Sequence, residues 1–241
     1  MIENPTPNRM LVILAHPDDE SFAVGGTLAK LSHQGIEVIL LTATRGEIGI
    51  PGLEPGKAGA IREQELLRAA KYLGIRVYFL DYRDGELSTV DPWKLIEHIA
   101  CWIDTVQPQV IITFGPDGVS GHPDHVAISL AVTQIVEQFY PNICLVYIAP
   151  SEATAMGCGV SAFGVNPDEP LIAVDISDYK LEKIRAIQSH ASQHPPLEGK
   201  AEEEIDKVPC NELFTVAHSV KESNDLVGCF NGEEETAFRV A

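Results

Sequence analysis

Basic residues and long apolar runs are both scarce in this sequence. No stretch approaches the uninterrupted run of about 18 apolar residues that a membrane helix requires. Lys and Arg number 17 against 35 Asp and Glu, which gives a formal net charge of −18. Such a charge repels nucleic-acid phosphates and anionic lipid headgroups. We therefore expect no nucleic-acid partner and no membrane partner. By itself the acidity indicates solubility and no particular function.

Cysteine is used without a recognisable pattern. The five cysteines stand at positions 101, 144, 158, 210 and 229, with no Cys-x-x-Cys pair among them. An odd number at such spacings argues against a disulfide framework, and a chain of 241 residues is too large to need one. The opening MIENPTPNRM lacks the basic and apolar regions of a signal peptide. These absences predict reduced thiols and a cytoplasmic location.

Several common catalytic loops are missing. There is no Gly-x-Ser-x-Gly of a serine hydrolase, and GLEPGKA at 52–58 lacks the spacing and the hydroxyl of a Walker loop. The segment 157–162, GCGVSA, fits Gly-x-Gly-x-x-Ala, but it neither follows a predicted strand directly nor lies in the first βαβ unit. We therefore do not expect a dinucleotide site there.

Apolar runs of strand length alternate with stretches of helical periodicity. The predicted strands are 10–15, 36–44, 76–81, 108–115, 142–149, 170–177 and 212–220, and the predicted helices are 22–34, 59–73, 91–106, 124–139 and 179–193. Alternation of this kind is typical of βαβ units. It predicts an α/β fold with a Rossmann-like, mostly parallel sheet and helices on both faces. With no linker and no internal repeat, a single domain spanning 1–241 is expected.

A histidine and three acids follow the first predicted strand, in the segment His16-Pro17-Asp18-Asp19-Glu20. Ligand sites of open α/β sheets form at the carboxyl ends of strands, which is where this cluster falls. Imidazole and carboxylate together suit zinc or a similar divalent ion. The alternative is a polar cap on the next helix, with Asp18 or Asp19 as the N-cap residue.

The segment Gly-His-Pro-Asp-His at 121–125 repeats the His-Pro-Asp core after the fourth strand and a glycine-rich loop. Capping does not explain why a histidine recurs at both strand ends. Catalytic zinc takes three protein ligands and keeps an open position, and His16, Asp19 and one histidine of this segment would supply them. Asp18, the remaining acid beside the metal, could then act as general base for the attacking water.

Together the two segments resemble those of the LmbE/PIG-L family of metal-dependent deacetylases, which remove acetyl groups from N-acetylglucosaminyl compounds. The resemblance extends from residue 10 to about 195, and 196–241 would be a C-terminal extension of the same domain. It implies a Zn²⁺ ion, with Fe²⁺ or another divalent ion as alternatives, bound by His16, Asp19 and His125.

The same resemblance implies roles for the neighbouring residues. Asp18 would be the general base, and His122 would stabilise the oxyanion or protonate the leaving amine. Asp124 would orient His122 and stabilise its charge. Some relatives that act on sugar-inositol substrates carry a tyrosine where this chain has Ser120. The identity of the substrate therefore stays open.

Weaker pieces of the family pattern are TRGEIG at 44–49, IREQEL at 61–66, YRDG at 82–85 and SHASQ at 189–193. They imply that Arg62 and Asp84 lie near the sugar and that Glu47 lies at the rim of the site. Each has an ordinary alternative. Arg62 could pair with Glu65 on a solvated helix face, Asp84 could be a turn former before Gly85, and Glu47 could be a solvated loop residue.

The remaining histidines are less informative. His190 and His194 are four residues apart, but the prolines at 195 and 196 disfavour helical geometry at His194. We expect His190 to point into the site and His194 to lie on the surface. Structural roles are expected for His33, His98 and His218.

The family resemblance implies hydrolysis of an acetamide on a small N-acetylated sugar. One alternative is a metal-dependent amidase acting on a thiol or sugar conjugate. Another is a sugar-binding or regulatory module that has kept the metal site and lost turnover, although the intact Asp18 argues against it. The family resemblance also implies a homo-oligomer.

Overall fold

A computed structural model describes residues 8–149, 171–193, 201 and 204–218 of the chain. His194 and the segment 157–162 lie outside the described residues, as does most of 196–241.

Strands and helices follow one another in the predicted order. The first part contains β1 (Arg9–Leu14), α1 (Asp19–His33), β2 (Glu37–Thr44), α2 (Pro55–Leu73), β3 (Arg76–Tyr82), the 3-10 turn η1 (Leu87–Thr89), α3 (Pro92–Val106), β4 (Val110–Phe114), α4 (Pro123–Phe139) and β5 (Cys144–Ala149). The second part contains β6 (Leu171–Asp175), η2 (Ser177–Tyr179), α6 (Lys180–Ser189), η4 (Ile205–Lys207) and β7 (Asn211–His218).

Two helices begin earlier than the sequence predicted. Helix α1 begins at Asp19 and not at residue 22, and α2 begins at Pro55 and not at residue 59. The residues that precede the predicted starts are charged, small or proline, and they lack the apolar periodicity from which a helix is predicted. Helix α3 starts close to the predicted position, and Asp91 is its N-cap residue. The side chain of Asp91 accepts a hydrogen bond from the backbone N–H of Trp93.

The sheet has the strand order β3-β2-β1-β4-β5-β7-β6. The five strands from β3 to β5 are parallel to their neighbours, whereas β7 runs antiparallel to both β5 and β6. The prediction of a mostly parallel sheet is confirmed. The sequence did not indicate that the last strand would be inserted between β5 and β6.

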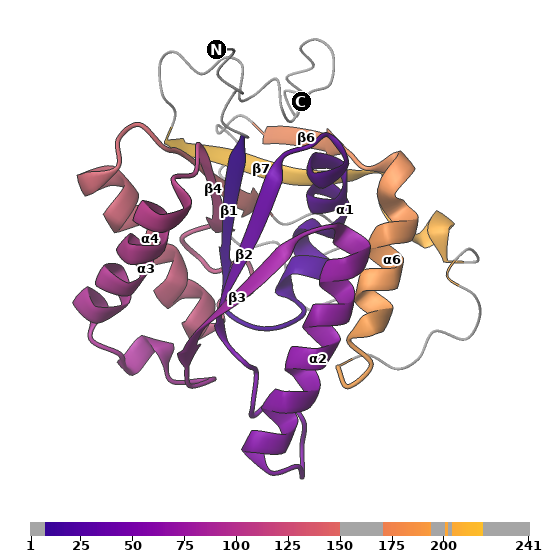
Figure 1. Ribbon diagram of the computed structural model, residues 1–241, viewed down its shortest axis with the longest axis horizontal. Coiled ribbons are helices and arrows are strands. Elements are labelled where there is room, and N and C mark those ends of the chain that lie inside the picture. Colours follow the sequence, from indigo (N-terminus) through magenta and orange to yellow (C-terminus); the bar gives the residue numbers. More distant parts are fainter. Residues whose placement is uncertain (1–7, 150–170, 194–200, 202–203, 219–241) are drawn as a thin grey trace, which may run out of the picture.

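Helices cover both faces of the sheet. Figure 1 shows α1, α2 and α6 on one face and α3 and α4 on the other. Because neither face meets water, the central strands are apolar along most of their length, and all of β4 and β5 is buried. Among the described residues, no helix is both long enough and apolar enough to cross a membrane.

A buried ion pair fastens β7 to the helices of one face. Glu212 of β7 accepts hydrogen bonds from the backbone N–H groups of Gly26 and Thr27 in α1. Its Oε1 atom also lies 2.5 Å from Nζ of Lys183 in α6. The C-terminal strand is thereby tied to the helix that follows β1.

The strand order reverses between β1 and β4, because the chain leaves these adjacent parallel strands toward opposite sides of the sheet. A crevice forms outside the carboxyl ends of strands at such a point. The two His-Pro-Asp segments follow these two strands and therefore meet there.

Candidate active site

The three predicted metal ligands converge at the carboxyl ends of β1 and β4. Nδ1 of His16 lies 3.2 Å from Nε2 of His125 and 3.7 Å from Oδ2 of Asp19. Nε2 of His125 lies 3.4 Å from Oδ1 of Asp19. Ligand atoms bound at about 2.1 Å to a tetrahedral zinc ion stand about 3.4 Å apart. The spacing of these atoms therefore suits a small divalent cation.

The outer nitrogen of each imidazole has an oxygen acceptor. Nδ1 of His125 lies 3.1 Å from the carbonyl oxygen of Gly118. Nε2 of His16 lies 3.2 Å from Oδ2 of Asp124 and 3.1 Å from Oδ1 of Asp84. A proton on each outer nitrogen leaves two lone pairs facing one another, and a cation between them satisfies both. The donor set thus fits a metal ion.

Negative charge is concentrated around His16. Burial lowers the pKa of His16, but Asp124, Asp84 and Asp19 outweigh burial and raise it to about 10. Three carboxylates around one imidazole stabilise positive charge at this position, whether a proton or a metal ion carries it.

The side chain of Asp18 does not cap helix α1, which was the alternative that the sequence allowed. Asp18 occupies the N-cap position, but its side chain makes no capping hydrogen bond. The carboxylate of Asp19 accepts a hydrogen bond from the backbone N–H of His16, at 2.8 Å. Burial and the Asp19 charge raise the pKa of Asp18 to about 7, while Arg62 opposes the rise. A carboxylate with this pKa suits a general base near neutral pH.

Arg62 is buried, so the alternative of a solvated helix charge is wrong. Its side chain donates to the carbonyl oxygens of Pro17, at 2.5 Å, and Gly46, at 3.0 Å. Its Nη2 atom lies 3.3 Å from Oδ2 of Asp18. Gly46 has φ 63, and a Cβ there would overlap the guanidinium. Arg62 therefore supports the turn that carries Asp18.

His122 stands at the start of α4 and faces the two histidine ligands. Its ring centroid is 4.8 Å from that of His16 and 5.0 Å from that of His125. Its Nδ1 atom accepts a hydrogen bond from the backbone N–H of Asp124 at 3.2 Å. Burial and the two neighbouring imidazoles lower the pKa of His122. A neutral ring with Nδ1 as acceptor carries its proton on Nε2 and can donate from there.

The carboxylate of Asp124 is directed at His16, whereas the family resemblance implied that it would orient His122. Besides contacting His16, it accepts the backbone N–H groups of Gly85, at 2.7 Å, and Leu87, at 3.1 Å. Burial raises the pKa of Asp124, but these hydrogen bonds lower it below its usual value. The physical reason is that the first turn of α4 buries Asp124 completely and leaves His122 exposed.

Asp84 and Glu47 are linked to each other and to this network. Besides contacting His16, Asp84 accepts the N–H of Ile48 at 3.2 Å, so it does more than form a turn. Oε1 of Glu47 accepts the N–H of Asp84 at 3.0 Å. Oε2 of Glu47 is buried and has no hydrogen-bond partner among the described residues. Glu47 is therefore not an ordinary solvated loop residue.

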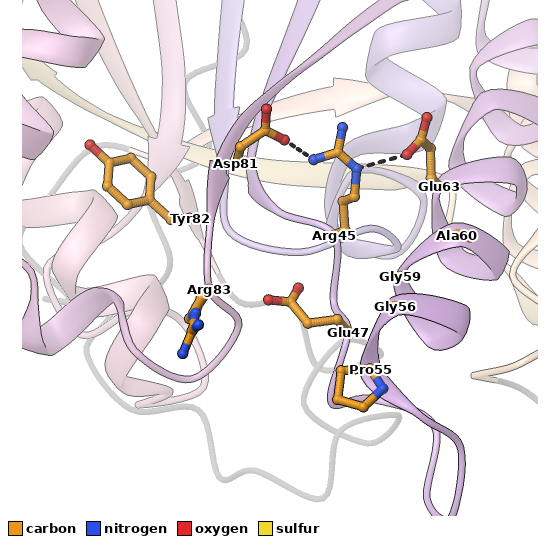
Figure 2. Close-up of a pocket in the computed structure, with 10 residues that line it drawn as sticks. All are labelled: Arg45, Glu47, Pro55, Gly56, Gly59, Ala60, Glu63, Asp81, Tyr82 and Arg83. Atoms are coloured by element: carbon orange, nitrogen blue, oxygen red, sulfur yellow. Dashed lines mark hydrogen bonds and ion pairs between the residues drawn. The ribbon is translucent and has the colours of Figure 1, made fainter.

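Glu47 also lines a cavity of about 360 Å³ between the first turns of α2 and the end of β3 (Figure 2). Arg45 crosses this cavity and forms ion pairs with Glu63 and Asp81. Arg83 lies on the β3 side, near the Glu47 carboxylate in Figure 2. Two arginines and three carboxylates stand among its lining residues. The hydrogen bond from the Asp84 N–H to Glu47 connects this wall to the histidine cluster.

His190 does not point into the metal cluster. Its Nε2 atom lies 2.7 Å from Oε1 of Glu20, and both residues are fully buried. Sequence reasoning gave Glu20 no role of its own, although it is the third acid of the His-Pro-Asp-Asp-Glu segment. Of the other histidines, His33 packs on Tyr179 and His218 contacts the Pro141 carbonyl oxygen, as structural roles require.

Comparison with known proteins places this site in context. The family model described as "PIG-L: GlcNAc-PI de-N-acetylase" matches residues 11–136. A "1D-myo-inositol 2-acetamido-2-deoxy-alpha-D-glucopyranoside deacetylase" of Saccharomonospora viridis is 32% identical and covers 90% of this chain and 97% of its own. A "probable N-acetyl-alpha-D-glucosaminyl L-malate deacetylase 2" of Bacillus anthracis is 31% identical over 76% of this chain and 80% of its own.

A solved structure agrees with these sequence relatives. The N,N'-diacetylchitobiose deacetylase from Pyrococcus horikoshii superposes with a TM-score of 0.65 and 25% identity, covering 94% of this chain and 92% of the other. Residues 11–136, which the family model matches, contain both His-Pro-Asp segments. These segments supply all the clustered histidines and aspartates of the site apart from Asp84, namely His16, Asp19, His122, Asp124 and His125. The chain belongs to the PIG-L family of deacetylases, enzymes that hydrolyse an acetamide bond.

Proposed function

We propose that this enzyme is a divalent-metal-dependent hydrolase, with zinc as the expected ion, that removes the acetyl group of an N-acetylglucosaminyl conjugate. The observation that carries the proposal is the convergence of His16, Asp19 and His125, with the carboxylate of Asp18 beside them. Two sequence relatives are named for an inositol and a malate conjugate of the same sugar, which supports the substrate class.

His16, Asp19 and His125 would hold the ion. When bound, the ion would supply Lewis acidity, which polarises a carbonyl group and lowers the pKa of water. Asp124 and Asp84 orient His16 through its outer nitrogen, and the Gly118 carbonyl does the same for His125. These contacts hold both rings with an unprotonated nitrogen turned to the ion.

Asp18 is the proton acceptor for the water that attacks the acetamide carbon. Burial and the neighbouring Asp19 charge raise its pKa, which makes it a better proton acceptor than an exposed carboxylate. The proton passes from Asp18 to the nitrogen as the C–N bond breaks, so that the products are acetate and a free amine. Arg62 keeps the accepting carboxylate and its turn in place.

His122 is the hydrogen-bond donor for the oxyanion that develops on the acetamide. Its Nδ1 atom is occupied by the N–H of Asp124, so the ring can present only Nε2 toward the crevice. A neutral donor stabilises the developing charge without giving up its proton. This role depends on position, because the ring lies beside both histidine ligands.

The cavity at Glu47 would accommodate the group attached to the sugar. Its carboxylate side chains could accept hydrogen bonds from the hydroxyl groups of such a substituent. Asp84 and Arg62 would lie on the sugar side of the reacting bond, next to His16 and Asp18 respectively. Glu47 has a free buried oxygen, which could accept a substrate hydroxyl.

Acetate release from a panel of N-acetylated compounds tests the proposal. The panel contains N-acetylglucosamine, its inositol and malate conjugates and an N-acylated thiol conjugate, each assayed with zinc-loaded and metal-free enzyme. We expect zinc-dependent acetate and free amine from a sugar conjugate, and no acetate from the metal-loaded Asp18→Asn control. Amine release from the thiol conjugate alone would favour the amidase alternative. A fully loaded wild-type protein that binds these sugars without turnover would favour a sugar-binding module.

A further inference from the structure

Asp18 holds a backbone conformation that residues with a Cβ rarely adopt. Its φ is 114° and its ψ is −28°. Non-glycine residues at positive φ are uncommon, and they persist only where surrounding contacts hold them. The proposed general base is therefore in a position that the fold must maintain.

Glu20 holds the backbone of Asp18 from the interior side. Its Oε2 atom accepts the N–H of Asp18 at 3.0 Å. The carbonyl oxygen of Asp18 accepts from the N–H groups of Ser21 and Phe22, the first hydrogen bonds of α1. Arg62 holds the same turn from the other side, through the Pro17 carbonyl and the Asp18 carboxylate.

The Glu20 carboxylate is in turn held by His190, which lies 170 residues away in the sequence. Nε2 of His190 lies 2.7 Å from Oε1 of Glu20, and Ser21 Oγ donates to the same oxygen at 2.5 Å. Both Glu20 and His190 are fully buried. A carboxylate without water needs such partners to remain in one orientation.

His190 belongs to a short segment, 190–193, that contacts three elements carrying site residues. Ser192 donates to both carboxylate oxygens of Glu65 in α2, the helix of Arg62. Gln193 donates to the carbonyl oxygen of Gly49, in the loop of Glu47. Of these three residues, only His190 contacts a residue that itself hydrogen-bonds to Asp18, namely Glu20.

We propose that His190 is a positioning residue for Asp18 and acts through Glu20. The imidazole fixes one oxygen of Glu20, so that the other oxygen accepts the Asp18 N–H and maintains the positive φ. The carboxylate of Asp18 then stays beside Asp19 and Arg62, where the attacking water is deprotonated. The functional part of this inference rests on the proposed role of Asp18. The structural part stands on the contacts alone.

Amide hydrogen exchange of the metal-free protein tests the structural part without any substrate. In His190→Asn the shortened amide cannot reach Glu20, and we expect the Asp18 N–H to exchange at least tenfold faster. In His190→Gln the amide nitrogen can occupy the place of Nε2, so exchange should return toward the wild-type rate. The matched control is Ser192→Ala, which removes the side-chain hydrogen bond of the same segment to Glu65 and should leave the Asp18 amide unchanged. Unchanged exchange in a folded His190→Asn protein would overturn the proposal.

Kinetics of the zinc-loaded variants test the functional part. His190→Asn should lower kcat at least tenfold, with KM and metal content close to those of wild type, and His190→Gln should recover most of the rate. The thermal midpoint of His190→Asn should fall, because the buried Glu20 carboxylate loses a partner. An equal loss in Ser192→Ala would assign the effect to general loosening of the segment and overturn the role of His190. If the wild-type enzyme releases no acetate from any substrate, the proposed function fails, and the exchange measurement still decides the positioning.

Discussion

Oδ2 of Asp124 lies 3.2 Å from Nε2 of His16 and accepts the N–H of Gly85 at 2.7 Å. The same ring nitrogen also contacts Asp84. Asp124 therefore contacts an imidazole that would bind the metal. Replacing Asp124 should change the affinity for the metal more than it changes kcat. This distinguishes it from its neighbour His122.

Asp124→Asn should lower zinc affinity by about 10–100-fold, the usual effect of removing a partner that orients a histidine ligand. Competition with a chelator of known affinity measures it. At saturating zinc, kcat should change much less than in His122→Ala. Unaltered zinc affinity with a large loss of kcat would instead restore the family-based expectation that Asp124 serves His122.

His122→Ala should lower kcat by about 10²–10³-fold, typical of losing one oxyanion donor, and leave KM and metal content nearly unchanged. Because Nδ1 of His122 also caps α4, the thermal midpoint must be measured on the same preparation. A lower midpoint with normal kcat would assign the residue to helix capping alone.

His125→Ala should lose most of the bound metal, because it removes one of three ligand atoms at the converging point. Elemental analysis after dialysis against zinc should give about one ion per chain for wild type and well below one for the variant. His98→Ala is the matched control, since His98 packs on Tyr82 away from the cluster. Full occupancy in His125→Ala would show that another ligand set binds the ion.

Asp18→Asn should retain the metal and lose about 10²–10⁴-fold in rate, the typical contribution of a general base. Asparagine can keep a polar contact to Arg62 but cannot accept a proton. Metal content and kcat at saturating substrate are measured together. Near-normal turnover would mean that a different group takes the proton.

The pH profile should report Asp18 and respond to Arg62. Only the carboxylate form accepts a proton, so kcat/KM should fall as the pH drops through the pKa of Asp18. That pKa is about 7 without a metal, and a bound cation lowers it. Arg62→Gln removes a charge that lowers the pKa, so the acidic limb should move to higher pH. Arg76→Gln, at the opposite end of the sheet, should leave the limb in place.

The elements of the fold could be read from the sequence because both periodicities are strong. The strand at 10–15 and the helix at 124–139 lie within a residue of β1 and α4. The direction and place of β7 could not be read, because its apolar pattern is the same whichever neighbours it pairs with. Pairing depends on contacts between β7 and strands up to about seventy residues earlier, which local pattern does not encode.

The site was predictable at the level of the motif and less so at the level of contacts. The spacing of His16, Asp19 and His125 followed from two strand ends that the topology brings together. Which imidazole the Asp124 carboxylate faces depends on the rotation of the first turn of α4, which the sequence does not give. A surface charge was the alternative for Arg62 because its neighbours on α2 are charged. Its burial depends on contacts with Gly46 and Pro17, which are distant in the sequence.

The insertion of β7 between β5 and β6 also has a consequence for folding during synthesis. Every residue proposed for catalysis or metal binding lies between 16 and 125, so a nascent chain carries the complete chemical set long before Glu212 is made. Until then, among the residues that the structure describes, β5 has no strand on its outer edge and β6 has no partner strand, and the N–H groups of Gly26 and Thr27 lack their carboxylate. At ordinary rates of synthesis this lasts for seconds, during which the exposed edge is prone to pairing with other chains. We therefore expect the folding of β7 into the sheet, and not completion of the motifs, to be the step at which newly made enzyme becomes active.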